Sequence, residues 1–412
     1  MTATASKQPG TPAGLVLVVN SGSSSIKYRL IDPAAGTSLA SGLVECIGEE
    51  GSRFRHRSDD RELTRDSPVP DHDAGFRAIV AAFEETGPAL DDAGLVGVGH
   101  RVVHGGQRFS EPVIVDDQVA ATIRELEPLA PLQNPANLAC IEAARRLRPD
   151  LPQVAVFDTA FHRTLPAHAA TYALPVELAA RYGIRRYGFH GTSVQYVVGE
   201  AARLLSRQAD AIDLVVLHLG NGASATAVGR GRSVDTSMGL SPLEGLVMGT
   251  RCGDIDPAVV FHLHRTAGLG YDEIERTLNH GSGLKGLAGA NDMREVRRRA
   301  IAGDEQARLA VEVYCYRIRK YVAAYYAVLG RVDAVVFTAG VGENDPAVRA
   351  ASLAGLERLG ITVDPARNEA SSQSARAISP DGAEVVVLVV PTDEELEIAR
   401  QTLAVVRASA HR

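Results

Sequence analysis

The sequence has few cysteines, and none stands in an arrangement that binds zinc or builds a disulfide framework. Its 412 residues include four cysteines, and no two of them form a CxxC motif. They are Cys46, Cys140, Cys252 and Cys315. Scattered cysteines of this kind suit a reducing compartment, so we expect a cytoplasmic protein.

The sequence also lacks a long apolar run and an excess of positive charge. The longest clear apolar run, residues 385–390, is far short of the roughly 18 residues that a membrane-spanning helix needs. The formal net charge is -7, which gives no electrostatic reason to bind nucleic acid. Residues 1–14 lack the apolar segment of a signal peptide and predict a flexible extension. We therefore expect neither a membrane nor a nucleic acid as partner.

The most informative stretch that is present covers residues 15–31, LVLVVNSGSSSIKYRLI. Its apolar start predicts a buried strand, and its end, where apolar residues alternate with Lys27 and Arg29, predicts a second, half-buried strand. The turn between them, which begins at Asn20, offers backbone N–H groups and hydroxyls on small residues. The sequence therefore predicts a hairpin whose turn can hold a phosphate group.

A second stretch repeats this pattern. Residues 213–228, DLVVLHLGNGASATAV, again run from an apolar strand through a polar turn into an alternating strand. One copy alone is best explained as an ordinary serine-rich turn, but two copies favour nucleotide binding by two related domains that face one another. Neither copy has the Walker pattern, which needs a glycine loop opening onto a helix through Gly-Lys-Ser/Thr. Two domains agree with the length, at roughly 100 to 200 residues per domain.

Charged side chains follow two other predicted strands. Arg101 lies at the end of the apolar run 95–103, and Asp158 follows the run 153–157. Open α/β sheets place ligand chemistry just beyond the carboxyl ends of their strands. Each residue also has a simpler explanation, because an arginine near a strand end is most often a surface ion pair and Asp158 could cap a helix.

Two further candidates lie in glycine-containing segments of the second half. His190 stands between an aromatic residue and a glycine, just ahead of a predicted helix. Arg251 lies in a glycine-flanked loop where it could bind an anion. A local ion pair with Asp254 or Asp256 would explain Arg251 equally simply.

Taken together, the polar residues at these turns suit phosphoryl transfer, in which a protein positions the reactants and neutralises charge. They are Asn20, Arg101, Asp158, His190, Asn221, Arg251 and Glu394. The set contains two arginines that match phosphate oxygens, and no nucleophile with a partnered base. Asn20 and Glu394 offer oxygens of the kind that magnesium prefers. A capping box between Thr392 and Glu395 is the simpler explanation of the acidic pair at 394–395.

Nine stretches over nearly the whole chain carry these candidates. They are NSGSSSIKY from Asn20, GHRVVHGG from Gly99, VFDTAFH from Val156, RRYGFHGTS from Arg185, HLGNGAS from His218, DTSMGLSPLEGLVMGTRCGDIDP from Asp235, NDMRE from Asn291, FTAGVGEN from Phe337 and PTDEE from Pro391. In type and order these motifs resemble those of the acetate kinases, within the acetate and sugar kinase, Hsp70 and actin superfamily.

The resemblance implies an α/β fold of two duplicated actin-like (ribonuclease H-like) ATPase domains with a cleft between them. We place the first at residues 15–160 plus 395–412 and the second at 161–394. It also implies reversible in-line transfer of a phosphoryl group from ATP to acetate, giving ADP and acetyl phosphate, with Mg²⁺ or alternatively Mn²⁺. The family suggests a homodimer that serves acetyl-CoA synthesis.

The resemblance assigns roles residue by residue. The catalytic set is Arg101 and Arg251, which clamp the transferred group, His190, which stabilises the transition state, and Asp158. Asn20 and Glu394 hold the metal. The nucleotide contacts are expected from Lys27, His218, Leu219, Gly220, Asn221, Gly222, Asp292, Met293, Arg294, Gly340, Val341, Gly342, Glu343 and Asn344. The acetate contacts are expected from Arg101, Val103, Leu132, Phe189 and Pro242.

Three residues differ from the family pattern in their chemistry or identity. Acetate, like side-chain carboxylates with pKa values of about 4, is already ionised at pH 7 and needs no base. We therefore interpret Asp158 as orienting metal-bound water or acetate, in place of its family role as proton acceptor. Gln133 stands where histidine is usual, and Asp393 where asparagine is usual. We expect activity to survive both departures, with an altered metal preference.

Two alternatives stay open. A propionate or butyrate kinase differs only in the volume of its apolar pocket, and one methylene is worth only ~1 to 3 kcal/mol of discrimination. An actin-like or Hsp70-like nucleotide switch would belong to a different class. Such a switch would not need Arg101, Arg251 and His190 to converge on an acceptor.

Overall fold

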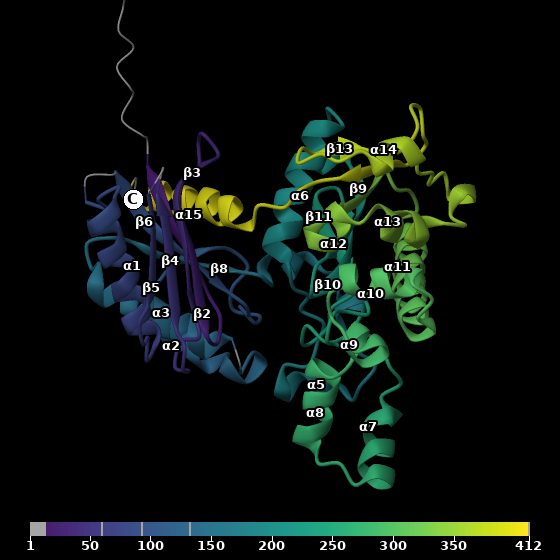
Figure 1. Cartoon of the computed structure of the whole chain (residues 1–412), viewed down its shortest axis with the longest axis horizontal. Coiled ribbons are helices and arrows are strands. Elements are labelled where there is room, and N and C mark those ends of the chain that lie inside the picture. Colours follow the sequence, from purple (N-terminus) through teal and green to yellow (C-terminus); the bar gives the residue numbers. More distant parts are fainter. Residues whose placement is uncertain (1–13, 59–60, 92–93, 132, 411–412) are drawn as a thin grey trace, which may run out of the picture. The chain divides into compact units, whose positions relative to one another are not determined.

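The computed structural model describes residues 14–58, 61–91, 94–131 and 133–410, and it divides into two compact units (Figure 1). The first unit contains the chain up to Ala160 and again from Glu394, and the second is Phe161–Asp393. Glu394, which we expected to end the second domain, thus belongs to the first unit. Except for Gly14, the expected N-terminal extension lies outside the described residues.

The first unit is built on a sheet of eight strands in the order β5-β4-β3-β2-β1-β6-β8-β7. Their bounds are β1 (Leu15–Ser21), β2 (Ser25–Asp32), β3 (Thr37–Glu45), β4 (Arg53–Ser58), β5 (Arg61–Asp66), β6 (Leu95–Val102), β7 (Val113–Ile114) and β8 (Gln153–Phe157). β1 pairs antiparallel with β2 and parallel with β6, and β6 pairs parallel with β8. The first predicted hairpin is therefore the β1–β2 pair.

The second unit repeats this arrangement in a sheet of six strands in the order β11-β10-β9-β12-β14-β13. The bounds are β9 (Asp213–Leu219), β10 (Ala223–Gly229), β11 (Arg232–Thr236), β12 (Ala334–Thr338), β13 (Arg376–Ala377) and β14 (Val386–Val389). β9 pairs antiparallel with β10 and parallel with β12, and β12 pairs parallel with β14. The predicted duplication of an α/β domain is confirmed. A cleft between the two domains stays a prediction.

Helices cover both sheets. The first unit has α1 (His72–Thr86), α2 (Asp117–Glu125), α3 (Asn134–Leu147) and α15 (Glu394–Ala410). The second has α4 (Ala167–Ala170), α5 (Val176–Tyr182), α6 (Gly191–Leu204), α7 (Ala258–His262), α8 (Tyr271–His280), α9 (Gly283–Ala288), α10 (Met293–Ile301), α11 (Glu305–Leu329), α12 (Ala339–Asn344), α13 (Pro346–Leu353) and α14 (Pro365–Glu369). Short 3-10 turns occur at Glu127–Leu129, Ala160–Thr164, Ala209–Ala211 and Glu357–Leu359, and a π turn at Leu263–Ala267. Within the described ranges, no helix is long and apolar enough to span a bilayer.

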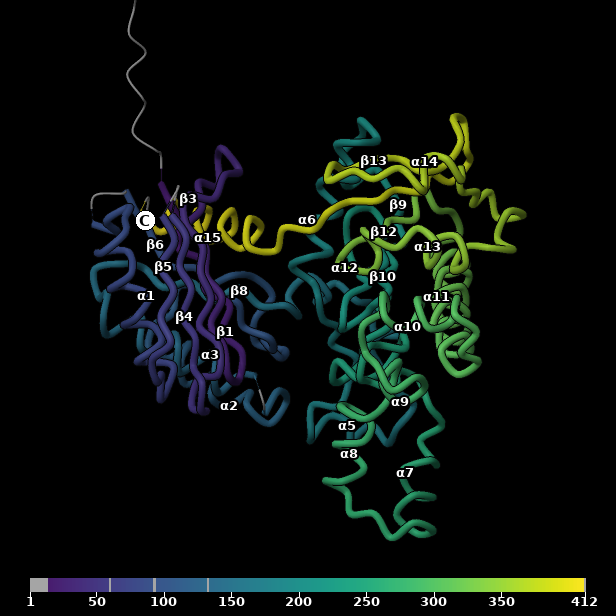
Figure 2. The backbone as a smooth tube through the Cα atoms, in the orientation of Figure 1, coloured from purple at the N-terminus to yellow at the C-terminus, as the bar shows by residue number. Residues whose placement is uncertain are grey.

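The C-terminal helix α15 packs against the first strands of the chain, as its yellow trace beside the purple and blue strands shows (Figures 1 and 2). Val98 of β6 lies in the core cluster that α1 and α3 complete on one face of the sheet. The neighbouring residues Gly97 and Gly99 point to the opposite face. A Cβ on Gly99 would overlap Thr402 Oγ1 of α15, so glycine allows this close approach.

The segment of residues 128–137, PLAPLQNPAN, contains three prolines and by itself predicts a rigid loop, but α3 begins inside it. The helix begins at Asn134, and Pro135 lies in its first turn. Proline is compatible with that position, since the backbone N–H groups of the first turn have no partner within the helix. The early start places Asn134 and Asn137 on the helix, where both are buried.

Replacing Gly99 by alanine is expected to destabilise the first unit. The new methyl group would also lie 2.9 Å from Ile398 Cγ2, so α15 must shift or strain at a cost of about 1 to 3 kcal/mol. We expect a lower thermal unfolding midpoint by calorimetry.

Gly199→Ala is the matched control, because this exposed helical position has no atom within 4 Å of a new Cβ. It should leave the midpoint unchanged or raise it. Adding Thr402→Ala to Gly99→Ala should restore part of the loss. An unchanged midpoint for Gly99→Ala alone would contradict the packing of α15 on β6.

Candidate functional site

Parallel strand pairing brings three predicted site residues together at one edge of the first sheet. Asn20 of β1 pairs with Arg101 of β6, which in turn pairs with Val156 of β8. Asp158 directly follows β8, and its backbone N–H donates to the carbonyl oxygen of Val102 at 3.0 Å. Residues that are 81 and 57 positions apart in the chain thus become neighbours.

Arg101 binds Asp158 through two donor groups. Its Nε lies 3.1 Å from both carboxylate oxygens, and its Nη2 lies 2.5 Å from Oδ2. A third donor, Nη1, lies 3.3 Å from Asn20 Oδ1. Asp158 is only 2% exposed, so Arg101 is the cation that makes this buried charge tolerable. The pair is therefore part of the site and not the surface ion pair that strand-end arginines usually form.

Glu394 places further negative charge next to this pair. Burial raises the pKa of Glu394 to about 7, with Asp158 and Glu395 adding to the effect and Arg101 opposing it. Burial would also raise the pKa of Glu395, but the charge and hydrogen bond of Lys27 lower it below its usual value. Lys27 Nζ lies 2.6 Å from Glu395 Oε1. Lys27 thus compensates the negative charge of Glu395. Arg101 lies close to both remaining carboxylates, those of Asp158 and Glu394.

This donor set fits a hard divalent cation. Asn20, Asp158 and Glu394 supply oxygen atoms, and their carboxylates outnumber the neighbouring guanidinium. In the described ranges, no three or more histidine, cysteine, aspartate or glutamate side chains are grouped so that they could hold a metal ion. A cation that keeps several water ligands and takes further oxygens from a phosphate would suit so small a set of protein ligands.

In the second unit, His190 is positioned by its neighbours on β9 and β10. It adopts a left-handed backbone conformation with φ of 59° just before α6. Its Nδ1 lies 3.0 Å from Ser224 Oγ, and its ring stacks on His218 with the ring centres 4.0 Å apart. His218 Nδ1 lies 2.8 Å from the Oγ of Ser193, a residue in the first turn of α6. Two serines and one histidine therefore fix the orientation of the His190 ring.

Arg251 reaches the same place from a later loop. A Cβ on Gly222 would lie 3.4 Å from both Arg251 Nη1 and His190 Nε2, so the two side chains flank this glycine. Arg251 Nη1 donates to the carbonyl oxygen of Pro242 at 3.2 Å, and burial lowers its pKa. No carboxylate among the described residues forms an ion pair with it.

The two aspartates that could have paired with Arg251 are engaged elsewhere. Asp254 Oδ2 lies 3.2 Å from Arg317 and accepts from Tyr321 Oη at 2.9 Å. Asp256 accepts from the backbone N–H of Ala258. The simpler explanation of Arg251 as a local ion pair is therefore wrong.

A cavity of about 850 Å³ lies in the second unit and contains part of the predicted nucleotide contacts. The predicted residues that line it are Gly220, Asn221, Asp292, Met293, Arg294, Gly340, Val341 and Asn344. Asp292 caps α10 and binds Arg294, whose hydrogen bonds lower the pKa of Asp292 to about 2. Further lining residues that the motifs did not indicate include Leu284, Arg297, Arg298 and Tyr314. Arg297 could have been noted as a helical neighbour of Arg294.

The other predicted nucleotide residues lie outside the lining of this cavity. His218 and Leu219 are buried, and His218 stacks on His190. Glu343 points inward, because its Oε1 accepts from the backbone N–H groups of Ala339 at 2.8 Å and Thr392 at 3.0 Å. Gly342 is also buried, and Gly222 lies between Arg251 and His190. Lys27 belongs to the first unit.

The predicted acetate contacts are divided between the two units. Val103 follows β6, and its backbone N–H donates to Asn137 Oδ1 at 3.1 Å. Phe189 is 2% exposed, and Pro242 accepts the hydrogen bond from Arg251. Leu132 lies outside the described residues.

Sequence reasoning missed the two asparagines of α3. Asn134 exchanges two hydrogen bonds with the backbone of His104, at 3.1 and 3.0 Å. Asn137 bridges Val103 to the carbonyl oxygen of Ser21, which it binds at 2.6 Å. They hold the turns after β1 and β6 in place. The only signal in the sequence is the asparagine spacing in the motif NPAN.

The chain matches the model of the acetokinase family over residues 15–400. It is 60% identical to an acetate kinase of Streptomyces coelicolor over 400 residues, which is 96% of this chain and 98% of that protein. It superposes on a crystal structure of Porphyromonas gingivalis acetate kinase with a TM-score of 0.91, at 42% identity and with 95% and 100% of the two chains covered. A propionate kinase from Francisella tularensis gives a TM-score of 0.88 at 41% identity, with 94% and 98% covered.

The two arginines are expected to differ in what they contribute to stability. Arg101→Met leaves the buried Asp158 without its cation and should lower the free energy of unfolding by about 3 to 5 kcal/mol. Arg251→Met removes one hydrogen bond to a carbonyl and should cost about 1 kcal/mol. Denaturant unfolding of both variants at pH 8 measures the difference.

Adding Asp158→Asn to Arg101→Met should restore part of the loss, because the amide removes the unpaired charge. Arg251→Met is the matched control and should gain nothing from Asp158→Asn. Equal losses for both variants would contradict the assignment of Arg101 as the partner of Asp158.

Proposed function

Because the chain belongs to the acetokinase family, we propose that it transfers the terminal phosphoryl group of ATP to acetate and works reversibly. It is a kinase that uses a carboxylate as acceptor and requires ATP and a divalent metal ion. The observation that carries the proposal is Arg251. This half-buried guanidinium lacks a carboxylate partner among the described residues, and it lies beside His190 and next to a turn that lines the 850 Å³ cavity.

The charges in each unit suggest how the reaction proceeds. We propose that Arg251 and His190 neutralise the equatorial oxygens of the phosphoryl group as it moves, since guanidinium and imidazole donors bind phosphate oxygens well. Arg101, held by Asp158, binds the same group or the acetate carboxylate. Neither step requires a covalent intermediate on the protein. In-line transfer then depends on positioning and charge neutralisation alone.

The metal is proposed to be Mg²⁺, held by Asn20 and Glu394. When bound, the ion would act as a Lewis acid and would reduce the negative charge on the transferred group. Magnesium requires few protein ligands and keeps its waters, which agrees with the small donor set in the first unit. Mn²⁺ would accept the same oxygen ligands.

Asp158 is proposed to act by orientation. Its carboxylate is already occupied by Arg101 at 2.5 to 3.1 Å, and acetate carries no proton to remove at neutral pH. The carboxylate is therefore proposed to set the direction of the Arg101 guanidinium, in place of the metal-bound water or acetate that the sequence suggested. This role replaces that of a general base.

The acceptor is proposed to be acetate in preference to propionate or butyrate. Overall similarity does not separate these acceptors, because an acetate kinase and a propionate kinase superpose almost equally well on this chain. The acetate kinases among its relatives, at up to 60% identity over nearly the whole chain, support the shorter acid.

We also propose that the protein is a cytoplasmic homodimer. The second unit exposes large apolar side chains, among them Phe261 at 52%, Tyr271 at 60% and Tyr316 at 59%. A subunit interface would remove such side chains from water, which supports an interface on this unit. Dimerisation would give a molar mass in solution of twice 43.6 kDa.

A panel of acyl acceptors tests the function. Incubation with ATP, Mg²⁺ and hydroxylamine should convert acetate to its hydroxamate, with kcat/KM about 10-fold or more above that for propionate. Release of ADP should depend on acetate. Hydrolysis of ATP at the same rate without any carboxylic acid would instead indicate a nucleotide switch, and a preference for propionate or butyrate would overturn the choice of acetate.

Asp158→Asn tests the proposed role of this carboxylate. The substitution keeps the shape but removes the charge that orients Arg101, so kcat should fall about 100-fold. The KM for acetate should rise, and the pH profile should keep its shape.

Asp393→Asn is the control for a change of charge near the metal site and should retain activity. An unchanged kcat and an unchanged KM for acetate in Asp158→Asn would contradict the proposal that Asp158 orients Arg101. If metal affinity and KM stayed normal while turnover was lost and then recovered at higher pH, Asp158 would be a base.

A further inference from the structure

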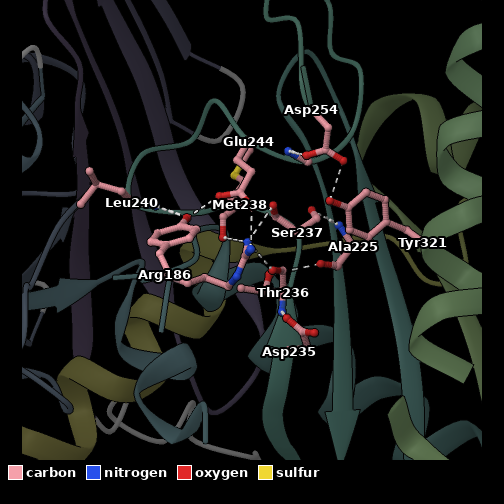
Figure 3. A network of polar contacts seen from close by, with 12 residues as sticks. Arg186, Ala225, Asp235, Thr236, Ser237, Met238, Leu240, Glu244, Asp254 and Tyr321 are labelled. Atoms are coloured by element: carbon pink, nitrogen blue, oxygen red, sulfur yellow. Dashed lines mark hydrogen bonds and ion pairs between the residues drawn. The ribbon is translucent and has the colours of Figure 1, made fainter. Parts of the chain in front are cut away.

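The loop formed by residues 237–245 of the second unit is held by an unusual concentration of polar contacts (Figure 3). The loop follows β11 and carries Pro242, whose carbonyl oxygen binds Arg251 Nη1 at 3.2 Å. Its conformation therefore decides where one wall of the proposed acetate pocket and one phosphate-binding arginine lie.

Arg186 binds both ends of this loop. Its Nη1 donates to the carbonyl oxygens of Thr236, Ser237 and Met238, at 3.0, 3.1 and 3.1 Å. Its Nη2 lies 2.6 Å from Glu244 Oε1. One guanidinium group thus joins the residues that enter the loop to the residue that leaves it. A lysine could not do this, because its single ammonium lacks the planar fork of donors.

Tyr172 completes the cluster from a third segment. Its hydroxyl donates to Glu244 Oε2 and accepts from the backbone N–H of Leu240 at 3.1 Å. Its ring lies 5.6 Å from the guanidinium carbon of Arg186, within the range of a cation–π contact. Gly239 lies against these groups, and a Cβ there would overlap both Glu244 Oε2 and Tyr172 Oη. The loop therefore has little freedom to move.

The same arginine belongs to the segment that carries the other site residues. Arg186 precedes Phe189 and His190 by three and four positions. The adjacent backbone N–H of Tyr187 donates to the carbonyl oxygen of Gly239 at 3.0 Å. Movement of the loop would consequently change the distance between Pro242 and the segment of Phe189 and His190.

We propose that Arg186, Glu244 and Tyr172 are positioning residues that set which carboxylic acids the protein accepts. They act through the loop, which places Pro242 and Arg251 against the substrate, and none of them is assigned a contact with it. The inference rests on the proposed function. A rigid pocket wall excludes the extra methylene of propionate, whereas a mobile wall accommodates it. Loosening the contacts among Arg186, Glu244 and Tyr172 should therefore reduce the preference for acetate over propionate more than it changes the KM for ATP.

Tyr172→Phe is the first test, since it removes only the hydroxyl that joins Glu244 to Leu240. The KM for acetate should rise roughly 5- to 20-fold and the preference for acetate over propionate should fall, because misplacement of a substrate contact by about 1 Å costs up to 100-fold. The KM for ATP should stay within about twofold of the wild-type value. Tyr182→Phe, at an exposed tyrosine of the same unit, is the matched control and should change neither quantity.

Glu244→Gln is the second test and keeps the shape of the side chain while removing its charge. It should change the acetate-to-propionate ratio in the same direction as Tyr172→Phe. An unchanged ratio in both variants would overturn the inference, as would equal rises in the KM for ATP and for acetate, which indicate a general structural effect. If Glu244→Gln does not fold, the ratio measured for Tyr172→Phe decides.

Wild-type activity separates this inference from the proposed function. If the wild-type protein forms no acyl hydroxamate with any acid, the proposed function fails whatever the variants do. If the wild type forms acetyl hydroxamate and the two variants keep its acid preference, the function stands and the positioning role is rejected.

Discussion

Parallel pairing of strands from distant parts of the chain is the constraint on which the rest of the structure depends. β1, β6 and β8 in the first unit, and β9, β12 and β14 in the second, run in the same direction. Their carboxyl ends therefore meet at one edge of each sheet, where the backbone must turn away. Asn20, Arg101 and Asp158 become neighbours for this reason, as do His218 and the α12 turn after β12 in the second unit.

The two arginines of the proposed reaction are held in opposite ways. Arg101 is bound to a carboxylate that is almost completely buried, so its direction is fixed and much of its charge is compensated. Arg251 is held by a carbonyl oxygen and has no carboxylate partner within the described ranges, because Asp254 is engaged by Arg317 and Tyr321. A half-buried cation of this kind gains most from a bound anion. The first arginine is thus suited to orientation and the second to charge neutralisation.

Much of the fold was predictable, because the spacing of apolar residues and the residue types in turns are local properties of the sequence. The hairpins at residues 15–31 and 213–228 follow directly from apolar runs and from alternation of apolar and polar residues. The start of α3 was not predictable, since the three prolines of residues 128–137 favour a loop, whereas Asn134 and Asn137 are buried in a helix that begins inside this segment. For the site, the motifs indicated many residues of the nucleotide cavity but not the direction of each side chain. Glu343 lies in a predicted motif and yet points to the backbone of Thr392.

The sequence by itself determined the duplicated α/β fold, the family and the polar turns at the strand ends, because these depend on patterns within a few residues or on whole motifs. Only the tertiary structure decided which partner each charged group has. Arg186 shows why: its guanidinium binds carbonyl groups about 50 positions away, and nothing near it in the chain specifies them. Ion pairing and hydrogen bonding depend on distances of about 3 Å, and those distances are set by how remote segments pack.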